Sequence, residues 1–124
     1  MTLEDIAKKM CAKGKGILAA DESTGTIAKR FKSINVENTE VNRLAFREAL
    51  FKSEAIKNYI GGIILFDETI RQKTSSGLSV PELIVKNGSI PGIKVDKGAK
   101  QLAGSHNEKI TEGLDGLKER MTEY

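Results

Sequence analysis

The stretch Gly14-Lys-Gly-Ile-Leu-Ala-Ala-Asp-Glu-Ser-Thr-Gly-Thr-Ile-Ala-Lys-Arg30 decides the fold class of this chain. Its apolar run, Ile17 to Ala20, predicts a buried β-strand because it is too short for a helix. Asp21 comes where the strand ends, and a helix is predicted over residues 24–32, capped by Ser23 or by the threonine after it. Parallel α/β sheets build their sites beyond the carboxyl ends of their strands. The stretch therefore delivers a carboxylate, hydroxyls, a helix N-terminus and an arginine to such an edge.

The rest of the chain continues the alternation of strands and helices. Apolar spacing, caps and turn residues predict the following elements: helices over residues 3–11, 40–51, 80–86 and 113–124, and strands over 60–66 and 90–95. A short helical turn is expected after Asp67-Glu68-Thr69, and residues 98–111 read as polar and irregular. Strands that alternate with helices indicate a parallel sheet. We therefore expect an α/β fold of about three parallel strands with flanking helices.

Composition excludes several function classes. The 124 residues suffice for one small domain, and the net charge of +3 is spread without a run of like charge, which argues against nucleic-acid binding. No apolar run approaches the roughly 20 residues that span a membrane. The single cysteine, Cys11, cannot form an internal disulfide, so a cytoplasmic protein is expected. No His/Cys spacing suggests a metal site, and the only histidine, His106, lies in a polar stretch.

A dinucleotide-binding loop is also disfavoured. Residues 14–19 match the glycine pattern G-x-G-x-x-G/A formally. Such a loop follows a strand and opens a helix, whereas these glycines precede the predicted strand. No cofactor is therefore expected.

Asp21 and Lys94 are the sharpest site candidates, because each follows a predicted strand run directly or nearly so. In a parallel sheet both would then face the same rim, where an ammonium beside a carboxylate keeps both groups charged and offers donors to a phosphate oxygen. The competing interpretation is a turn-capping Asp21 and an exposed Lys94 at a strand end, and the residues alone favour that interpretation.

The hydroxyls of Ser23 and Thr26, with Arg30 one turn further, suit a phosphate seat at a helix N-terminus. The alternative is an ordinary capped and solvated helix face. For Asp67 and Glu68, at the end of the second strand, a cap or salt-bridge role is expected.

The chain closely resembles class I fructose-bisphosphate aldolases. The resemblance rests on the opening stretch together with four further blocks in the family's order: Gly61-Gly-Ile-Ile-Leu-Phe-Asp-Glu-Thr69, Gly92-Ile-Lys-Val-Asp-Lys-Gly98, Leu102-Ala-Gly104 and Gly113-Leu-Asp-Gly-Leu117. It extends from about Leu3 to Tyr124 but covers only the N-terminal third or so of a family member. It implies that residues 1–124 form a single partial domain, the N-terminal part of a (β/α)8 TIM barrel.

The resemblance also implies an activity. Members of this family cleave fructose 1,6-bisphosphate reversibly to dihydroxyacetone phosphate and glyceraldehyde 3-phosphate, a reaction of glycolysis and gluconeogenesis. They use a lysine Schiff base and no metal or cofactor. By this resemblance Asp21 takes part in proton transfer, Lys94 binds the distal phosphate, and Ser23, Thr26 and Arg30 contact the bisphosphate.

The resemblance further places the Schiff-base lysine and the second phosphate site beyond Tyr124. We therefore expect this chain to carry part of the site, to be inactive alone and to contribute to a homo-oligomer in the full-length family member. Its partner would be a small sugar phosphate. The alternative is a non-catalytic sugar-phosphate-binding or interaction module derived from the same fold.

Overall fold

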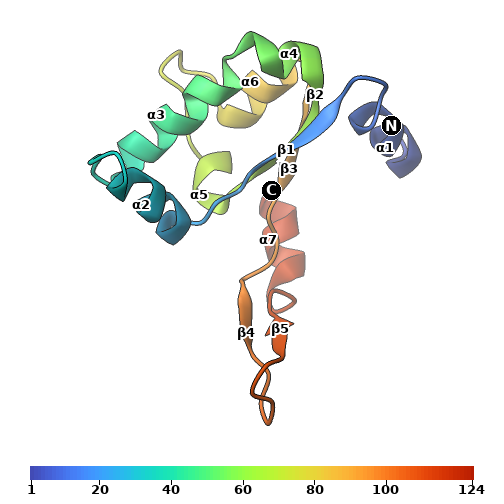
Figure 1. The fold of residues 1–124 in the computed structure, drawn as a ribbon. Helices are drawn as coiled ribbons and strands as arrows, with labels where there is room; N and C mark the ends of the chain where they lie inside the picture. The colour runs from blue at the N-terminus through green and yellow to red at the C-terminus, as the bar shows by residue number, and fades with distance from the viewer. The chain divides into compact units, whose positions relative to one another are not determined.

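A computed structural model describes residues 1–124, which divide into two compact units, Met1–Ile93 and Lys94–Tyr124. Each unit is described by itself. The elements of the first unit are α1 (Leu3–Met10), β1 (Gly16–Ala20), α2 (Thr24–Lys32), α3 (Glu40–Phe51), α4 (Glu54–Tyr59), β2 (Ile60–Leu65), α5 (Asp67–Ile70), α6 (Val80–Lys86) and β3 (Ile90–Ile93) (Figure 1). The predicted alternation of strands and helices is confirmed.

The three strands form one parallel sheet in the order β1-β2-β3. Its register pairs Ala20 with Leu65 and Leu65 with Ile93, so the last residues of the strands form one row. The three apolar runs of the sequence therefore lie side by side and point the same way, as predicted. Their carboxyl ends share one edge of the sheet, which is where a parallel α/β fold builds its sites.

The core lies between the sheet and the helices that follow it. Ile63 and Leu65 of β2 are fully buried, and Phe51 of α3, Ile56 of α4 and Ile84 of α6 pack with them. Helices α3, α4 and α6 gather beside the strands in Figure 1. This packing fixes β2 and the ends of its neighbours.

Caps begin the helices where the sequence places them. Ser23 caps α2 by accepting a hydrogen bond from the Thr26 amide, and Thr39 caps α3 in the same way. Thr2 with Asp5, and Ser79 with Glu82, form complete capping boxes. Each cap satisfies amide groups that a helix N-terminus leaves without a partner.

Helix α3 forms over its predicted range but does not bury a purely apolar face. Its apolar residues Val41 and Leu50 are 75% and 40% exposed. The buried side chains are instead Arg43, Arg47, Glu48 and Phe51. Two arginines and a glutamate thus occupy positions that an ordinary amphipathic helix gives to apolar residues, and α4, which follows, was not predicted.

The second unit contains β4 (Ala99–Gln101), β5 (Lys109–Thr111) and α7 (Leu117–Glu123). Strands β4 and β5 pair antiparallel, so the prediction of an irregular segment over residues 98–111 is wrong. The last helix begins later than its predicted start at Gly113. Arg120 of α7 donates to the main-chain oxygens of Val95 and Gly113 at 3.0 and 2.5 Å, which ties the helix to the chain on both sides of the hairpin.

No helix of the chain combines the length and the apolar character needed to cross a membrane.

Candidate active site

The corner between β1 and α2 holds the first group of predicted site residues. Strand β1 ends at Ala20, which is 3% exposed, and α2 begins at Thr24. Asp21 is therefore the first residue beyond a buried strand end, and its side chain is half-buried. The structure places this carboxylate at the carboxyl edge of the sheet, as the sequence predicts.

Ser23 and Thr26 come together at the start of α2. Their hydroxyl oxygens lie 3.2 Å apart, and the Thr26 amide donates to the Ser23 hydroxyl at 3.4 Å. The first turn of α2 contains no acidic residue. Hydroxyls and amides without a carboxylate among them suit an anion, because a helix N-terminus carries partial positive charge. This arrangement can also serve as the helix cap alone.

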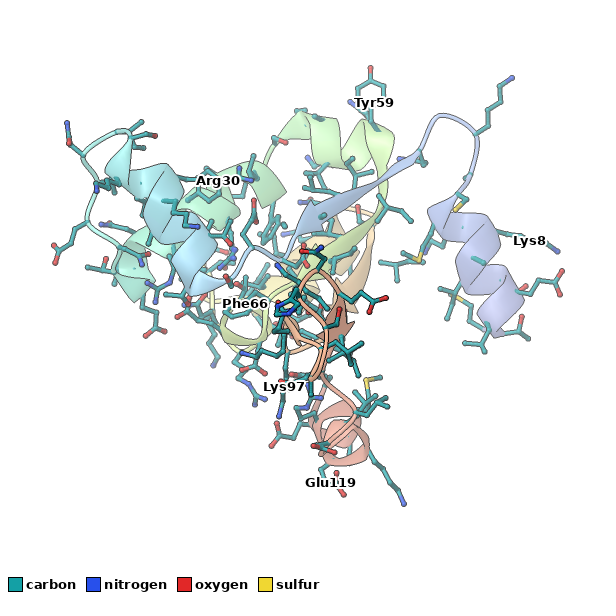
Figure 2. All side chains as sticks on the ribbon, turned by 60° about the horizontal axis from the view of Figure 1, so that its bottom comes forward. Lys8, Arg30, Tyr59, Phe66, Lys97 and Glu119 are labelled. Atoms are coloured by element: carbon teal, nitrogen blue, oxygen red, sulfur yellow. The ribbon has the colours of Figure 1, made fainter.

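Arg30 lies further along α2 (Figure 2) and reaches back to the corner. Its Nη2 lies 3.0 Å from Oε1 of Glu22, with the arginine 59% and the glutamate 17% exposed. Glu22 therefore links Arg30 to the residues around Asp21. Glu22 was not among the predicted site residues, because a glutamate in a turn reads as an exposed charge.

The end of β2 carries two ion pairs, as expected. Glu68 accepts hydrogen bonds from Nε and Nη2 of Arg43 at 2.8 and 2.6 Å. These bonds hold the pKa of the Glu68 carboxyl below its usual value despite partial burial. Asp67 pairs with Arg71 at 3.0 Å. The salt-bridge interpretation of both carboxylates is confirmed.

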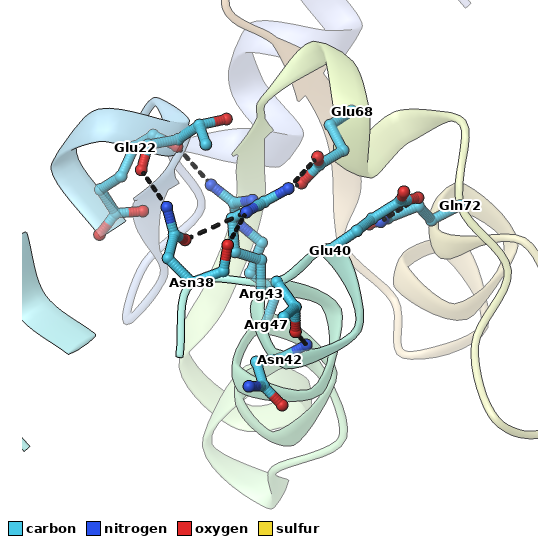
Figure 3. A network of polar contacts seen from close by, with 10 residues as sticks. Glu22, Asn38, Glu40, Asn42, Arg43, Arg47, Glu68 and Gln72 are labelled. Carbon is cyan, nitrogen blue, oxygen red and sulfur yellow. Dashed lines mark hydrogen bonds and ion pairs between the residues drawn. The ribbon is translucent and has the colours of Figure 1, made fainter. Parts of the chain in front are cut away.

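Two arginines of α3 connect the ends of β1 and β2 (Figure 3). Arg43 bonds Glu68 and also donates to the main-chain oxygen of Asn38 at 2.9 Å. Arg47, 1% exposed, donates through Nη2 to the main-chain oxygen of Glu22. Sequence reasoning missed this pair. The one available signal was their spacing of four residues, which puts them on the same side of α3 as Phe51.

Lys94 begins the second unit, directly after the last residue of β3. Its ammonium lies 2.6 Å from Oδ2 of Asp96, and the Gly98 amide donates to Oδ1 of the same carboxylate at 3.0 Å. These contacts, chiefly the one from Lys94, lower the pKa of Asp96. The predicted convergence of Lys94 and Asp21 on one cavity stays a prediction, because the two residues belong to different units.

The chemistry available at the β1–α2 corner is acid–base and anion-binding chemistry. Asp21 supplies a carboxylate, Ser23 and Thr26 supply hydroxyls beside helix amides, and Arg30 supplies a guanidinium. No group of three or more His, Cys, Asp or Glu residues is arranged to hold a metal ion.

Comparisons with known proteins agree with one another. A family model described as fructose-bisphosphate aldolase class-I matches residues 2–124. A Xylella fastidiosa protein named probable fructose-bisphosphate aldolase class 1 is 57% identical over 122 residues, which are 98% of this chain and 36% of that protein. Fructose-bisphosphate aldolase 5, cytosolic, of Arabidopsis thaliana is 58% identical over 118 residues, or 95% of this chain and 33% of that protein.

A solved structure gives the same result for the fold. It is a ternary co-crystal structure of fructose-bisphosphate aldolase from Plasmodium falciparum with TRAP and a small-molecule inhibitor. The TM-score is 0.92 at 49% identity, covering 97% of this chain and 35% of that one. The chain thus spans about a third of the length of the relatives that it matches.

Proposed function

Because the chain belongs to the class I fructose-bisphosphate aldolase family, we propose that it supplies one part of the active site of such an aldolase. The reaction is the reversible cleavage of fructose 1,6-bisphosphate to dihydroxyacetone phosphate and glyceraldehyde 3-phosphate. The observation that carries the proposal is the β1–α2 corner, where Asp21 stands beyond a buried strand end beside the paired hydroxyls of Ser23 and Thr26. The family match over residues 2–124 supports it.

In this proposal the substrate ketone condenses with a lysine amine and releases water. The protonated imine then accepts the electron pair of the carbon–carbon bond that breaks. Asp21 takes part in the accompanying proton transfers. Lys94, Ser23, Thr26 and Arg30 bind the phosphates of the sugar, and the chemistry requires no metal or other cofactor.

We further propose that the Schiff-base lysine comes from outside these 124 residues, so that the isolated chain is inactive. The full enzyme would act as a homo-oligomer. It would do so in the cytoplasm, and the name of the cytosolic Arabidopsis relative supports this location.

The test is a chimera in which the matching segment of the Xylella relative is replaced by residues 2–124 of this chain. We expect the chimera to cleave fructose 1,6-bisphosphate at a rate comparable to that of the relative. We also expect borohydride with dihydroxyacetone phosphate to trap a covalent adduct on the chimera and none on the isolated chain. A folded chimera without cleavage or adduct would contradict the proposal. If phosphate esters bind to the isolated chain and stabilise it, but borohydride traps no adduct on it, the binding-module alternative would be favoured.

A further inference from the structure

Arg47 is the largest fully buried side chain of the protein and lies behind the candidate site. It projects from α3, and its guanidinium carbon lies 5.8 Å from the centroid of the Phe66 ring. Its Nη2 donates to the main-chain oxygen of Glu22, whereas Nε and Nη1 have no protein acceptor (Figure 3). A guanidinium in this position is expensive to bury, since each donor that loses water without a partner opposes folding.

The charges around Arg47 show what offsets that cost. Burial lowers the pKa of Arg47, while Glu22, Glu68 and Asp21 favour its charged form and Arg43 opposes it. The favourable groups come from the carboxyl ends of β1 and β2. Arg47 is therefore a buried cation placed where two strands deliver their acidic residues.

The contact with Glu22 fixes a particular peptide group. The Glu22 carbonyl belongs to the peptide that joins Glu22 to Ser23, with Asp21 one residue before it. Arg30 holds the Glu22 side chain at 3.0 Å while Arg47 holds its main-chain oxygen. At the first residue of α2, the Asn38 side-chain amide donates to the Thr24 main-chain oxygen at 3.3 Å. Arg30, Arg47 and Asn38 thus all bond to the β1–α2 corner. Of these three side chains, only that of Arg47 reaches the corner from the buried core.

We propose that Arg47 is a positioning residue, which acts through the Glu22 carbonyl to set the directions of Asp21 and Ser23. The inference rests on the proposed function, because positioning matters only if those two side chains act on substrate. Without the Arg47 donor, the peptide group that joins Glu22 to Ser23 loses its hydrogen bond to the core, and the β1–α2 corner samples other orientations. Small misplacements of this kind reduce turnover even when the protein remains folded.

The test compares three variants of the chimera by kcat, KM and melting temperature. Arg47→Gln removes the charge and the reach to Glu22, so we expect kcat to fall about 10- to 100-fold in folded protein. Arg47→Lys restores a donor on a flexible stem and should give an intermediate kcat. Glu48→Ala is the control. It removes a similarly buried charge from the same helix, but Glu48 bonds Ser75 and Lys52 instead of the corner.

A general structural role predicts that Arg47→Gln and Glu48→Ala lower the melting temperature and leave kcat at the wild-type value. That result would overturn the inference while the active wild-type chimera upheld the proposed function. If Arg47→Gln does not fold, Arg47→Lys decides. A kcat below that of Glu48→Ala supports positioning, and a wild-type kcat overturns it. A folded wild-type chimera without activity would remove the proposed function and, with it, this inference.

Discussion

Asp21 owes its predicted role to its place in the chain, one residue beyond a strand whose last member is 3% exposed. If it transfers protons in the proposed reaction, Asp21→Asn in the chimera removes the group but keeps its shape and its place at the corner. We expect kcat to fall by about 10²- to 10⁴-fold, the usual contribution of a positioned acid or base, with a much smaller change in KM. Steady-state kinetics with fructose 1,6-bisphosphate measure both values.

The control for this variant is Glu54→Gln, which neutralises an exposed carboxylate whose salt bridge is with Lys57. It should leave kcat and KM at their wild-type values. Equal effects of the two substitutions would mean that loss of negative charge in general, and not Asp21 itself, accounts for the change.

Glu68 provides a prediction about pH. Hydrogen bonds from Arg43 lower the pKa of Glu68 in the folded state. The Arg43–Glu68 pair therefore stabilises the fold at any pH above the pKa that Glu68 has in the unfolded chain. This stabilisation is lost as the pH falls through the lower pKa of the folded state. Glu68→Gln should therefore destabilise the chimera by about 2 kcal/mol at neutral pH, the size of a charge-assisted hydrogen bond. The difference should shrink as pH drops below the ordinary glutamate pKa of about 4.3.

Denaturant titrations of wild type and Glu68→Gln at neutral and acid pH test this dependence. A stability difference that stays constant over the range would show that shape, and not ionisation, gives the side chain its effect. The same titrations of Glu82→Gln provide a comparison with an exposed carboxylate, because hydrogen bonds from Ser79 lower the pKa of Glu82 in a capping box at the protein surface.

Single residues also show how far the sequence could predict the site. The Ser23–Thr26 pair was predictable, because an N-cap side chain bonds to the main-chain amide two or three residues further along the helix, which brings it close to Thr26. Arg43 and Arg47 were not, because most charged residues on a helix face water. Their burial depends on Glu68 and on the Glu22 carbonyl, which approach α3 only in the folded chain.

Helix α1 and strand β2 make contact through glycine. A Cβ built on Gly61 would lie 2.4 Å from the main-chain oxygen of Met10, the last residue of α1. Gly61→Ala therefore forces α1 away from β2, and we expect a loss of about 1–3 kcal/mol, as for other overpacked sites. Chemical denaturation of the chimera measures the loss.

Gly25→Ala is the matched control for that substitution. Gly25 lies inside α2, and a Cβ there meets no atom within 4 Å. Alanine favours a helix over glycine, so this variant should be as stable as wild type or up to about 1 kcal/mol more stable. A Gly61→Ala variant as stable as Gly25→Ala would mean that α1 does not rest on β2 at this point.

The elements that the sequence predicts well are those with a strong local signal. Strands β1, β2 and β3 are short apolar runs bounded by turn residues, and α2, α3 and α6 have side-chain caps. Strands β4 and β5 have three residues each and are exposed throughout, so they lack the apolar alternation that indicates a strand. Helix α4 lacks a side-chain cap bond, and no glycine or proline separates it from α3.

In the molecule as a whole, the three-stranded sheet is open. The sheet ends at β1 on one side and at β3 on the other, so each has one edge without a neighbouring strand. Ile17 of β1 is 49% exposed, whereas strands of a parallel sheet are normally covered on both faces. The family's barrel closes with about eight strands, which leaves no edge. The isolated chain therefore exposes surfaces that the closed barrel covers.

We expect the isolated 124-residue chain to bind a hydrophobic dye and to unfold without a cooperative transition, because its unpaired edges and exposed apolar residues favour association and loose packing. Mixing it with the part of the Xylella relative that lies outside the matched segment should reduce dye binding, restore a cooperative transition and produce aldolase activity. Each of the two pieces alone should remain inactive. A sharp, reversible two-state transition of the isolated chain, with coincident signals from different probes, would show instead that the open sheet is stable without further strands.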